Sequence, residues 1–240
     1  MMFLQIVKAI KRIGSGAKAP LQKRSFMENT KIFSFLGLEH EDIPYYIAQA
    51  LTEKNKNVLV IDNSVRHNLF LSLNRLDEEA DSVEAGKAIF LRNKGFSENN
   101  FKKFDCVIIY HGMNPDFELL DESDINVLVL DYLISDLREI SKFIDYEELE
   151  DYDNLRYLFK DRPSGKVSEK YIKNKLRLYD VEEETSISLD ESDVAMRTNF
   201  QYNGIQPVKG LSSEMRAYVN SFVDIVAGKK KKKEDKGGDE

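Results

Sequence analysis

The sequence contains one cysteine and three histidines among its 240 residues. The single cysteine, Cys106, excludes a disulfide framework and a cysteine-built zinc cage, and it suits a reducing, cytoplasmic compartment. The histidines, His40, His67 and His111, lie far apart in the sequence, so we expect no histidine metal site. No apolar run approaches the ~20 residues that a membrane-spanning helix needs. These absences argue against secreted disulfide proteins, zinc modules and transmembrane proteins.

Charge is distributed unevenly along the chain. The 35 Lys and Arg residues against 42 Asp and Glu residues give a net charge of −7. Residues 1–31 carry a net +6 and the tail 229–240 a net +2, which leaves −15 for residues 32–228. An acidic body is a poor partner for nucleic acid, whose phosphates require Lys and Arg. Two basic ends on an acidic body instead favour electrostatic attachment through the ends.

Residues 1–14 have the pattern of a short basic amphipathic helix that ends at Gly14. Such a helix can lie in an anionic lipid interface, with its apolar face buried and its cations toward the headgroups. The residues expected to contact the membrane are Phe3, Ile6, Lys8, Ile10, Lys11, Arg12 and Ile13. Two alternatives remain open: the apolar face packs on the body or on a partner protein, or the segment is a targeting peptide.

We divide the rest of the chain into three parts. Residues 15–30 are expected to form a flexible linker, 31–228 one folded domain, and 229–240 a disordered tail. The tail begins with the five-lysine run Lys229–Lys233, which can bind anionic lipid or remain a solvated end.

The body alternates short apolar runs with helical patterns, which is typical of an α/β protein with a doubly wound, mostly parallel sheet and helices on both faces. The predicted strands are 31–36, 57–62, 88–91, 104–110 and 126–130, with weaker candidates at 156–159 and 185–189. The predicted helices include 43–51, 136–144, 167–176 and 213–227. Two acidic stretches, 145–153 and 182–184, are expected on solvated loops or helix faces, with a docking surface for a basic partner as the alternative.

The turn after the first predicted strand, Gly37–Pro44, is where such a sheet usually binds phosphate. A phosphate loop needs several glycines and a lysine. This turn has one glycine, no lysine, and carboxylates at Glu39, Glu41 and Asp42. Asp42 can instead cap the following helix, and Pro44 fits its first turn. The sequence therefore predicts that the phosphate site is absent.

The order of these segments resembles the opening of the ParA/MinD ATPases, the deviant Walker A class of P-loop proteins. The resemblance begins with Lys31–Leu36 and Asn57–Asp62, and Phe104–Gly112 is similar to the family's hydrophobic strand. Further matches are Asp124–Leu130 with Ser135–Ile140, Ile187–Ser192 with Arg197 and Gly204, and Ser212–Ala217. The resemblance covers residues 31–227 and implies a three-layer α/β/α P-loop NTPase-like fold.

This chain differs from the family at the positions that bind phosphate and Mg²⁺. The family's phosphate-binding lysines have no counterpart in the turn, and its Mg²⁺-binding hydroxyl falls near Ile43 or Pro44. Asp62 matches the first aspartate at the end of the family's second strand, but the position of the family's second aspartate is occupied by Ser64. The Walker B-like aspartate falls on Tyr110. Since phosphoryl transfer needs lysine and Mg²⁺, the resemblance implies a pseudo-ATPase with no nucleotide cofactor.

Several single residues have two interpretations. Asp62 is either a vestigial switch carboxylate or, preferably, a turn residue at the end of a strand. His40 and His111, with Glu39, Glu41 and Asp62, can bind a divalent metal or serve acid–base chemistry. We prefer ordinary surface histidines. Cys106 is expected to be a small buried core residue.

The preferred function is a non-catalytic, membrane-associated scaffold at the inner face of the cell membrane. The family resemblance implies roles in positioning, partition, pilus or secretion assembly, and homodimerisation through the nucleotide face. The protein partner is not identified. The alternatives are a soluble interaction domain without membrane contact, and an enzyme that uses the carboxylates and histidines at the sheet edge.

Deleting residues 1–14 is expected to abolish binding to vesicles that contain anionic lipid and to leave the fold intact. Each cation near such a surface contributes about 1 kcal/mol, and burial of the apolar face adds a part that salt does not weaken. Co-sedimentation with vesicles measures this, and changing both Ile6 and Ile10 to Asp should have the same effect. Equal binding by the truncated and full chains would contradict the prediction.

Overall fold

The computed structural model describes residues 30–37, 40–73, 80–92, 101–143, 149–150, 152–165, 167–203 and 207–229. The predicted N-terminal helix, the linker up to residue 29 and the tail from residue 230 lie outside these residues, as does Glu39. Within the described part of the chain, no helix has the length and apolar character required to cross a membrane.

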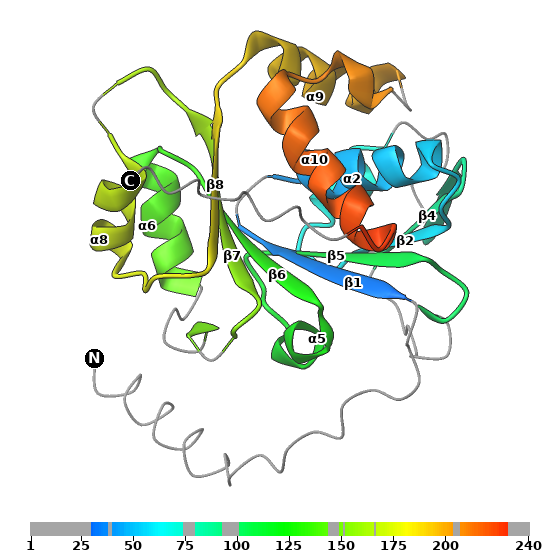
Figure 1. Cartoon of the computed structure of the whole chain (residues 1–240), viewed down its shortest axis with the longest axis horizontal. Helices are drawn as coiled ribbons and strands as arrows, with labels where there is room; N and C mark the ends of the chain where they lie inside the picture. The colour runs from blue at the N-terminus through cyan, green and yellow to red at the C-terminus, as the bar shows by residue number, and fades with distance from the viewer. Residues whose placement is uncertain are drawn as a thin grey trace, which may run out of the picture.

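The strands form one eight-stranded sheet within the described residues, in the order β3-β4-β2-β5-β1-β6-β7-β8. The strands are β1 (Lys31–Leu36), β2 (Val58–Asp62), β3 (Ser82–Ala85), β4 (Ala88–Arg92), β5 (Cys106–Gly112), β6 (Ile125–Leu130), β7 (Leu155–Arg162) and β8 (Glu183–Ser188). All neighbouring pairs are parallel except β3 with β4. The predicted doubly wound, mostly parallel sheet is therefore confirmed (Figure 1).

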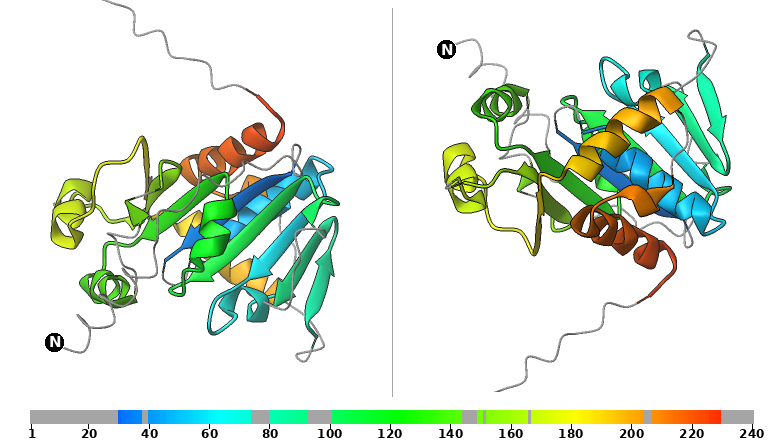
Figure 2. Two further views of the ribbon diagram at one scale, coloured as in Figure 1. Left: turned by 90° about the horizontal axis from the view of Figure 1, so that it is seen from below. Right: turned by 90° about the horizontal axis from the view of Figure 1, so that it is seen from above.

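Helices cover both faces of the sheet, which gives three layers (Figure 2). The helices are α2 (Asp42–Glu53), α3 (Asn68–Leu71), α5 (Phe117–Glu122), α6 (Ile134–Phe143), α8 (Glu169–Leu176), α9 (Glu191–Asn203) and α10 (Ser213–Val226), with a short 3₁₀ turn, η1 (Val208–Gly210). Side chains of α2, α9 and α10 pack on one face of the sheet, and those of α5, α6 and α8 pack on the other.

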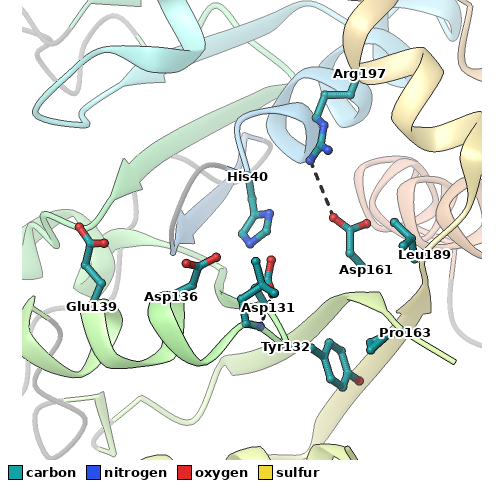
Figure 3. Close-up of a pocket in the computed structure, with 10 residues that line it drawn as sticks. His40, Asp131, Tyr132, Asp136, Glu139, Asp161, Pro163, Leu189 and Arg197 are labelled. Carbon is teal, nitrogen blue, oxygen red and sulfur yellow. Dashed lines mark hydrogen bonds and ion pairs between the residues drawn. The ribbon is translucent and has the colours of Figure 1, made fainter. Parts of the chain in front are cut away.

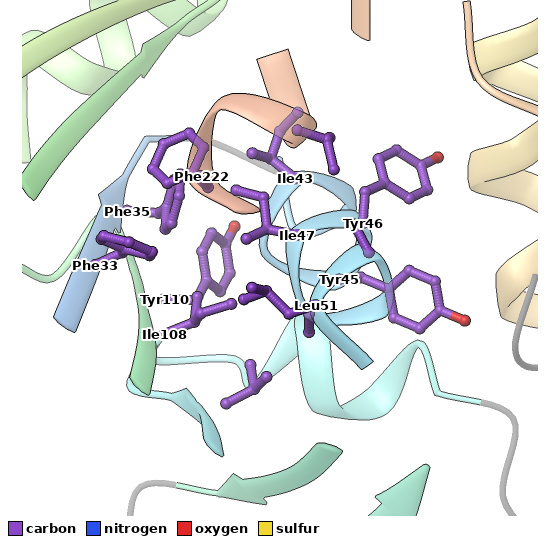
Figure 4. Close-up of a cluster of buried hydrophobic side chains, with 14 of the residues drawn as sticks. Phe33, Phe35, Ile43, Tyr45, Tyr46, Ile47, Leu51, Ile108, Tyr110 and Phe222 are labelled. Carbon is purple, nitrogen blue, oxygen red and sulfur yellow. The ribbon is translucent and has the colours of Figure 1, made fainter. Parts of the chain in front are cut away.

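The central strand β1 shows why a strand in this position needs apolar residues on both faces. Phe33 and Phe35 face α2 and α10, and the ring centroids of Phe33 and Phe222 lie 5.0 Å apart in an edge-to-face contact. Ile32 and Leu36 belong to clusters on the opposite face. Figure 4 shows the α2 side of this core. Each fully buried aromatic side chain contributes about 2 kcal/mol to stability through burial.

Some parts of the prediction need correction. The helices α3, α5 and α9 and the antiparallel strand β3 are not among the predicted elements, because each is short or buries too few side chains to show a clear period. Of the acidic stretch 182–184, Glu183 and Glu184 lie in the edge strand β8 rather than in a loop or helix. Their carboxylates form ion pairs with Arg156 and Lys173. Of the stretch 145–153, only residues 149, 150, 152 and 153 are described.

Gly37 follows β1 and brings the chain unusually close to β6. Its φ is +131°, and a Cβ atom built on it would lie 2.4 Å from the backbone oxygen of Val129. Any side chain would therefore be strained and would also clash with a backbone atom that cannot move aside. The one glycine of the first turn is required by packing against the neighbouring strand.

Changing Gly37 to Ala should lower the free energy of unfolding by about 3 kcal/mol, since backbone strain and overpacking act together. Gly86 is a matched control because its φ of +64° is also positive, but a Cβ there meets nothing within 4 Å. Gly86→Ala should cost only about 1 kcal/mol. Urea denaturation measures both values, and equal losses would show that the contact with Val129 has no energetic role.

Candidate functional site

The first turn lies at the carboxyl edge of the sheet, where ligands bind in folds of this kind. Two of its backbone amides donate hydrogen bonds within the protein. The amide of Gly37 donates to the carbonyl oxygen of Gly112 at 2.9 Å, and that of Ile43 donates to the carbonyl oxygen of His40 at 3.2 Å. In a phosphate loop such amides point toward the ligand.

The side chain of Asp42, the first residue of α2, forms a buried ion pair with Lys160 at the end of β7. One carboxylate oxygen of Asp42 lies 3.3 Å from Nζ of Lys160, and the two side chains are 1% and 2% exposed. The expectation that Asp42 caps α2 is wrong, since Glu41 occupies the N-cap position and no side chain there makes a capping hydrogen bond. Pro44 does lie in the first turn of the helix, as predicted.

Asp161 completes the charge balance around Lys160. Nζ of Lys160 donates to the Asp161 carboxylate at 2.9 Å, and the guanidinium of Arg197 on α9 lies 3.8 Å from the same carboxylate. Burial alone would lower the pKa of Lys160, but Asp42 and Asp161 outweigh it and raise that pKa above its ordinary value. The lysine is therefore charged at neutral pH, and its charge is neutralised by neighbouring carboxylates.

His40 lies in the same turn and is buried, so the expectation of a surface histidine is wrong here. Neither of its ring nitrogens has a hydrogen-bond partner. Burial lowers the pKa of His40 well below its usual value, and the charges of Lys160 and Arg197 lower it further. The imidazole is neutral at pH 7, with one N–H and one lone pair available.

His40 opens onto a pocket of about 520 Å³ at the carboxyl ends of β1, β6, β7 and β8 (Figure 3). This volume falls in the range of small-molecule sites. The lining residues are His40, Asp131, Tyr132, Leu133, Asp136, Glu139, Asp161, Pro163, Leu189 and Arg197. Four of them are acids and one is an arginine, so the lining is acidic.

Asp131 follows β6 directly and shows the effect of this charge. Its carboxylate accepts a hydrogen bond of 2.6 Å from the amide of Leu133, at the start of α6. Burial raises the pKa of Asp131, and the nearby carboxylates Asp136 and Asp161 raise it further. The negative charge around Asp131 is therefore only partly compensated.

His111 is also buried, so the expectation of a surface histidine is wrong for this residue as well, and its partners differ from the surroundings of His40. Its Nε2 lies 3.1 Å from Oγ of Ser34, and its Nδ1 lies 3.3 Å from Nδ2 of Asn63. Oγ of Ser34 in turn lies 2.7 Å from Oγ of Ser123. Burial lowers the pKa of His111 to about 3, so this ring is a neutral member of a buried polar chain.

The other predicted positions also belong to local structure. The carboxylate of Asp62 accepts hydrogen bonds from the amide and hydroxyl of Ser64 and from the amide of Phe70, so it organises the turn after β2. Tyr110 is a buried core residue, and Cys106 is a buried free thiol, as expected. Among the described residues, no group of three or more His, Cys, Asp or Glu side chains is placed to hold a metal ion.

Lys160, Asp161 and Asp131 belong to the site and were not singled out from the sequence. The available signal was their position, because each is a charged residue at the end of an apolar strand run, where the carboxyl ends of parallel strands meet. The weak pattern at 156–159 placed the end of that strand before Lys160, whereas β7 continues to Arg162.

Comparison with known proteins supports the fold. No protein-family model and no curated protein sequence matches the chain. Among solved structures, a ParA family ATPase from Chlorobium tepidum has a TM-score of 0.59 at 14% identity and covers 80% of this chain and 98% of its own. The Aquifex aeolicus MinC:MinD cell division complex has a TM-score of 0.56 at 14% identity, and the match covers 82% of this chain and 96% of that one. A Cyanothece McdA–ATP complex has a TM-score of 0.55 at 12% identity, and the match covers 85% of this chain and 98% of that one. The chain therefore has the three-layer fold of the ParA/MinD ATPases.

Changing Lys160 to Met should lower the free energy of unfolding by about 3–5 kcal/mol, because Asp42 would become an unpaired buried charge. The double variant with Asp42→Asn should recover most of this loss. Lys56→Met is the control: its ion pair with Asp105, at 3.0 Å, is one-third exposed and should contribute less than about 1 kcal/mol. Urea denaturation measures these differences, and a double variant as unstable as the single one would contradict the prediction.

Proposed function

We propose that this protein is a pseudo-ATPase with the ParA/MinD fold, in which an internal ion pair replaces the contacts to nucleotide phosphates. The observation that carries the proposal is the buried pairing of Lys160 with Asp42 and Asp161, beside the first turn. If this lysine turned away to neutralise a phosphate, Asp42 would be left as an unpaired buried charge.

The charge of the pocket supports the same conclusion. A triphosphate at this edge would face Asp131, Asp136, Glu139 and Asp161, with Arg197 as the cation among the lining residues. Two like charges about 5 Å apart repel by roughly 3 kcal/mol at an effective dielectric constant near 20. By the sequence resemblance, the family's second aspartate after the second strand and its Walker B-like aspartate fall on Ser64 and Tyr110. Nucleotide binding would thus lack both the cations that hold the phosphates and these carboxylates.

A protein with this fold that does not bind or hydrolyse nucleotide can still act by binding other proteins. The similar solved structures are ParA, MinD and McdA proteins, and the Aquifex aeolicus MinD is a cell division protein in complex with MinC. By analogy, we propose a scaffold role in positioning or assembly for this chain, carried by protein–protein contacts. Dimerisation would then be constitutive or induced by a partner, since nucleotide would not control it.

The proposed location is the cytoplasmic face of the cell membrane, and it rests on the sequence of residues 1–14 and of the lysine-rich tail. The basic helix would attach the acidic body to anionic lipid, and residues 15–30 would allow the body to stay away from the surface.

Isothermal titration of the full chain with Mg-ATP should show no binding, because no cation at the first turn is available for the phosphates. A nucleotide-dependent shift in melting temperature should also be absent. Saturable binding with a dissociation constant in the micromolar range would contradict the proposal. The Lys160→Met/Asp42→Asn chain is the matched control, since it should behave like the wild type toward Mg-ATP.

A further inference from the structure

The ring of His40 is a buried polar group that the fold leaves without a partner. The side chain is 5% exposed, and both ring nitrogens lack a hydrogen bond. Figure 3 shows the ring directed into the pocket, between Arg197 and the carboxylates at the start of α6. Buried polar groups without partners are rare, because each is destabilising. A ligand that hydrogen-bonds to this ring would offset that destabilisation.

The charges around the ring indicate the sign of such a ligand. Lys160 and Arg197 are balanced by Asp42 and Asp161, so these four charges sum to zero. The remaining lining carboxylates, Asp131, Asp136 and Glu139, face the same pocket and leave it with an excess of negative charge. Asp136 lies in the first turn of α6, where a carboxylate interacts favourably with the helix dipole. A cation is therefore attracted to the pocket, and an anion is repelled.

The apolar lining indicates that the cation is organic. Leu133 and Leu189 line the pocket and are 59% and 56% exposed, and Pro163 adds further apolar surface. These side chains can cover an aliphatic stem, which a bare metal ion lacks. The described carboxylates are also not grouped so that three of them could hold one metal ion.

We propose that this pocket binds an organic cation, an ammonium or guanidinium group on a short aliphatic stem. An N–H of the cation donates to the lone pair of the neutral His40 ring, and its charge faces Asp131, Asp136 and Glu139. The stem contacts Leu133 and Leu189. This inference goes beyond the proposed function, because it does not depend on whether the chain has lost ATP binding.

The same chemistry can come from two sources. One is a free small diamine or guanidine. The other is a basic side chain of a protein, and residues 1–30 of this chain supply six such side chains with one acid. A tethered cation has a millimolar effective concentration when its linker can reach the site.

Agmatine, which carries both an ammonium and a guanidinium group, is a suitable probe for calorimetric titration of the full chain at low salt. We expect saturable binding with one site per chain that weakens as salt rises. The double variant Asp136→Asn/Glu139→Gln should bind about tenfold more weakly. Glu84→Gln is the control, since Glu84 is an exposed acid on β3, at the far edge of the sheet, and its loss should leave binding unchanged.

Nitrogen-15 NMR of the imidazole rings tests the contact with His40 directly. On adding agmatine, the ring nitrogens of His40 should shift, whereas those of His111, whose bonds are already made within the core, should not. A variant that only damages the fold would disturb both rings, so this readout separates binding from structure.

Replacing Lys8, Lys11 and Arg12 by Gln in the full chain distinguishes the two sources. If the N-terminal segment occupies the pocket, the substituted chain should bind agmatine more tightly than the wild type. If the ligand is a free molecule, the two chains should bind equally. The proposal is overturned if neither chain binds agmatine saturably, or if the Asp136→Asn/Glu139→Gln variant binds agmatine as tightly as the Glu84→Gln variant does. It is also overturned if the ring nitrogen resonances of His40 do not shift on adding agmatine. If the chain did bind Mg-ATP, against the proposed function, the outcomes expected here with agmatine would stay the same.

Discussion

The buried ion pair between Asp42 and Lys160 joins the start of α2 to the end of β7, and the surrounding turn depends on it. Because both charges are almost fully buried, neither can lose its partner without a large cost in stability. The pair thereby fixes the direction in which the chain leaves β1 and enters α2. Burial lowers the pKa of His40, and the positive charge of Lys160 that the pair holds nearby lowers it further, so the ring is neutral.

The layered fold was predictable because its central strands are buried on both faces. Val58–Asp62 and Ile125–Leu130 are entirely buried, and each is mostly apolar, which makes it readily recognised in the sequence. The edge strand β3 and the helix α9 were not predictable in this way. In α9, Met196 and Phe200 are the buried hydrophobic side chains, whereas Val194 and Tyr202 are exposed, so the apolar residues of α9 do not mark a single face.

The candidate site was predictable only in part, because its residues come from segments that meet in space. The turn Gly37–Pro44 follows an obvious strand, and its acidic character was evident from the sequence. Its partner Lys160 lies more than 110 residues further along the chain, where a single lysine in a charged segment has no distinguishing pattern. The burial of His40 was equally hidden, since it results from the packing of β7 and α9 around the turn.

The central claim is that Lys160 is committed to Asp42 and Asp161 and is not available to phosphate. An experimental structure determined with Mg²⁺ and a non-hydrolysable ATP analogue at millimolar concentration tests this most directly. The account predicts that Nζ of Lys160 remains within hydrogen-bonding distance of both carboxylates, with no phosphate bound at the start of α2. A phosphate group at that position, with Lys160 turned away from Asp42 to contact it, would contradict the account.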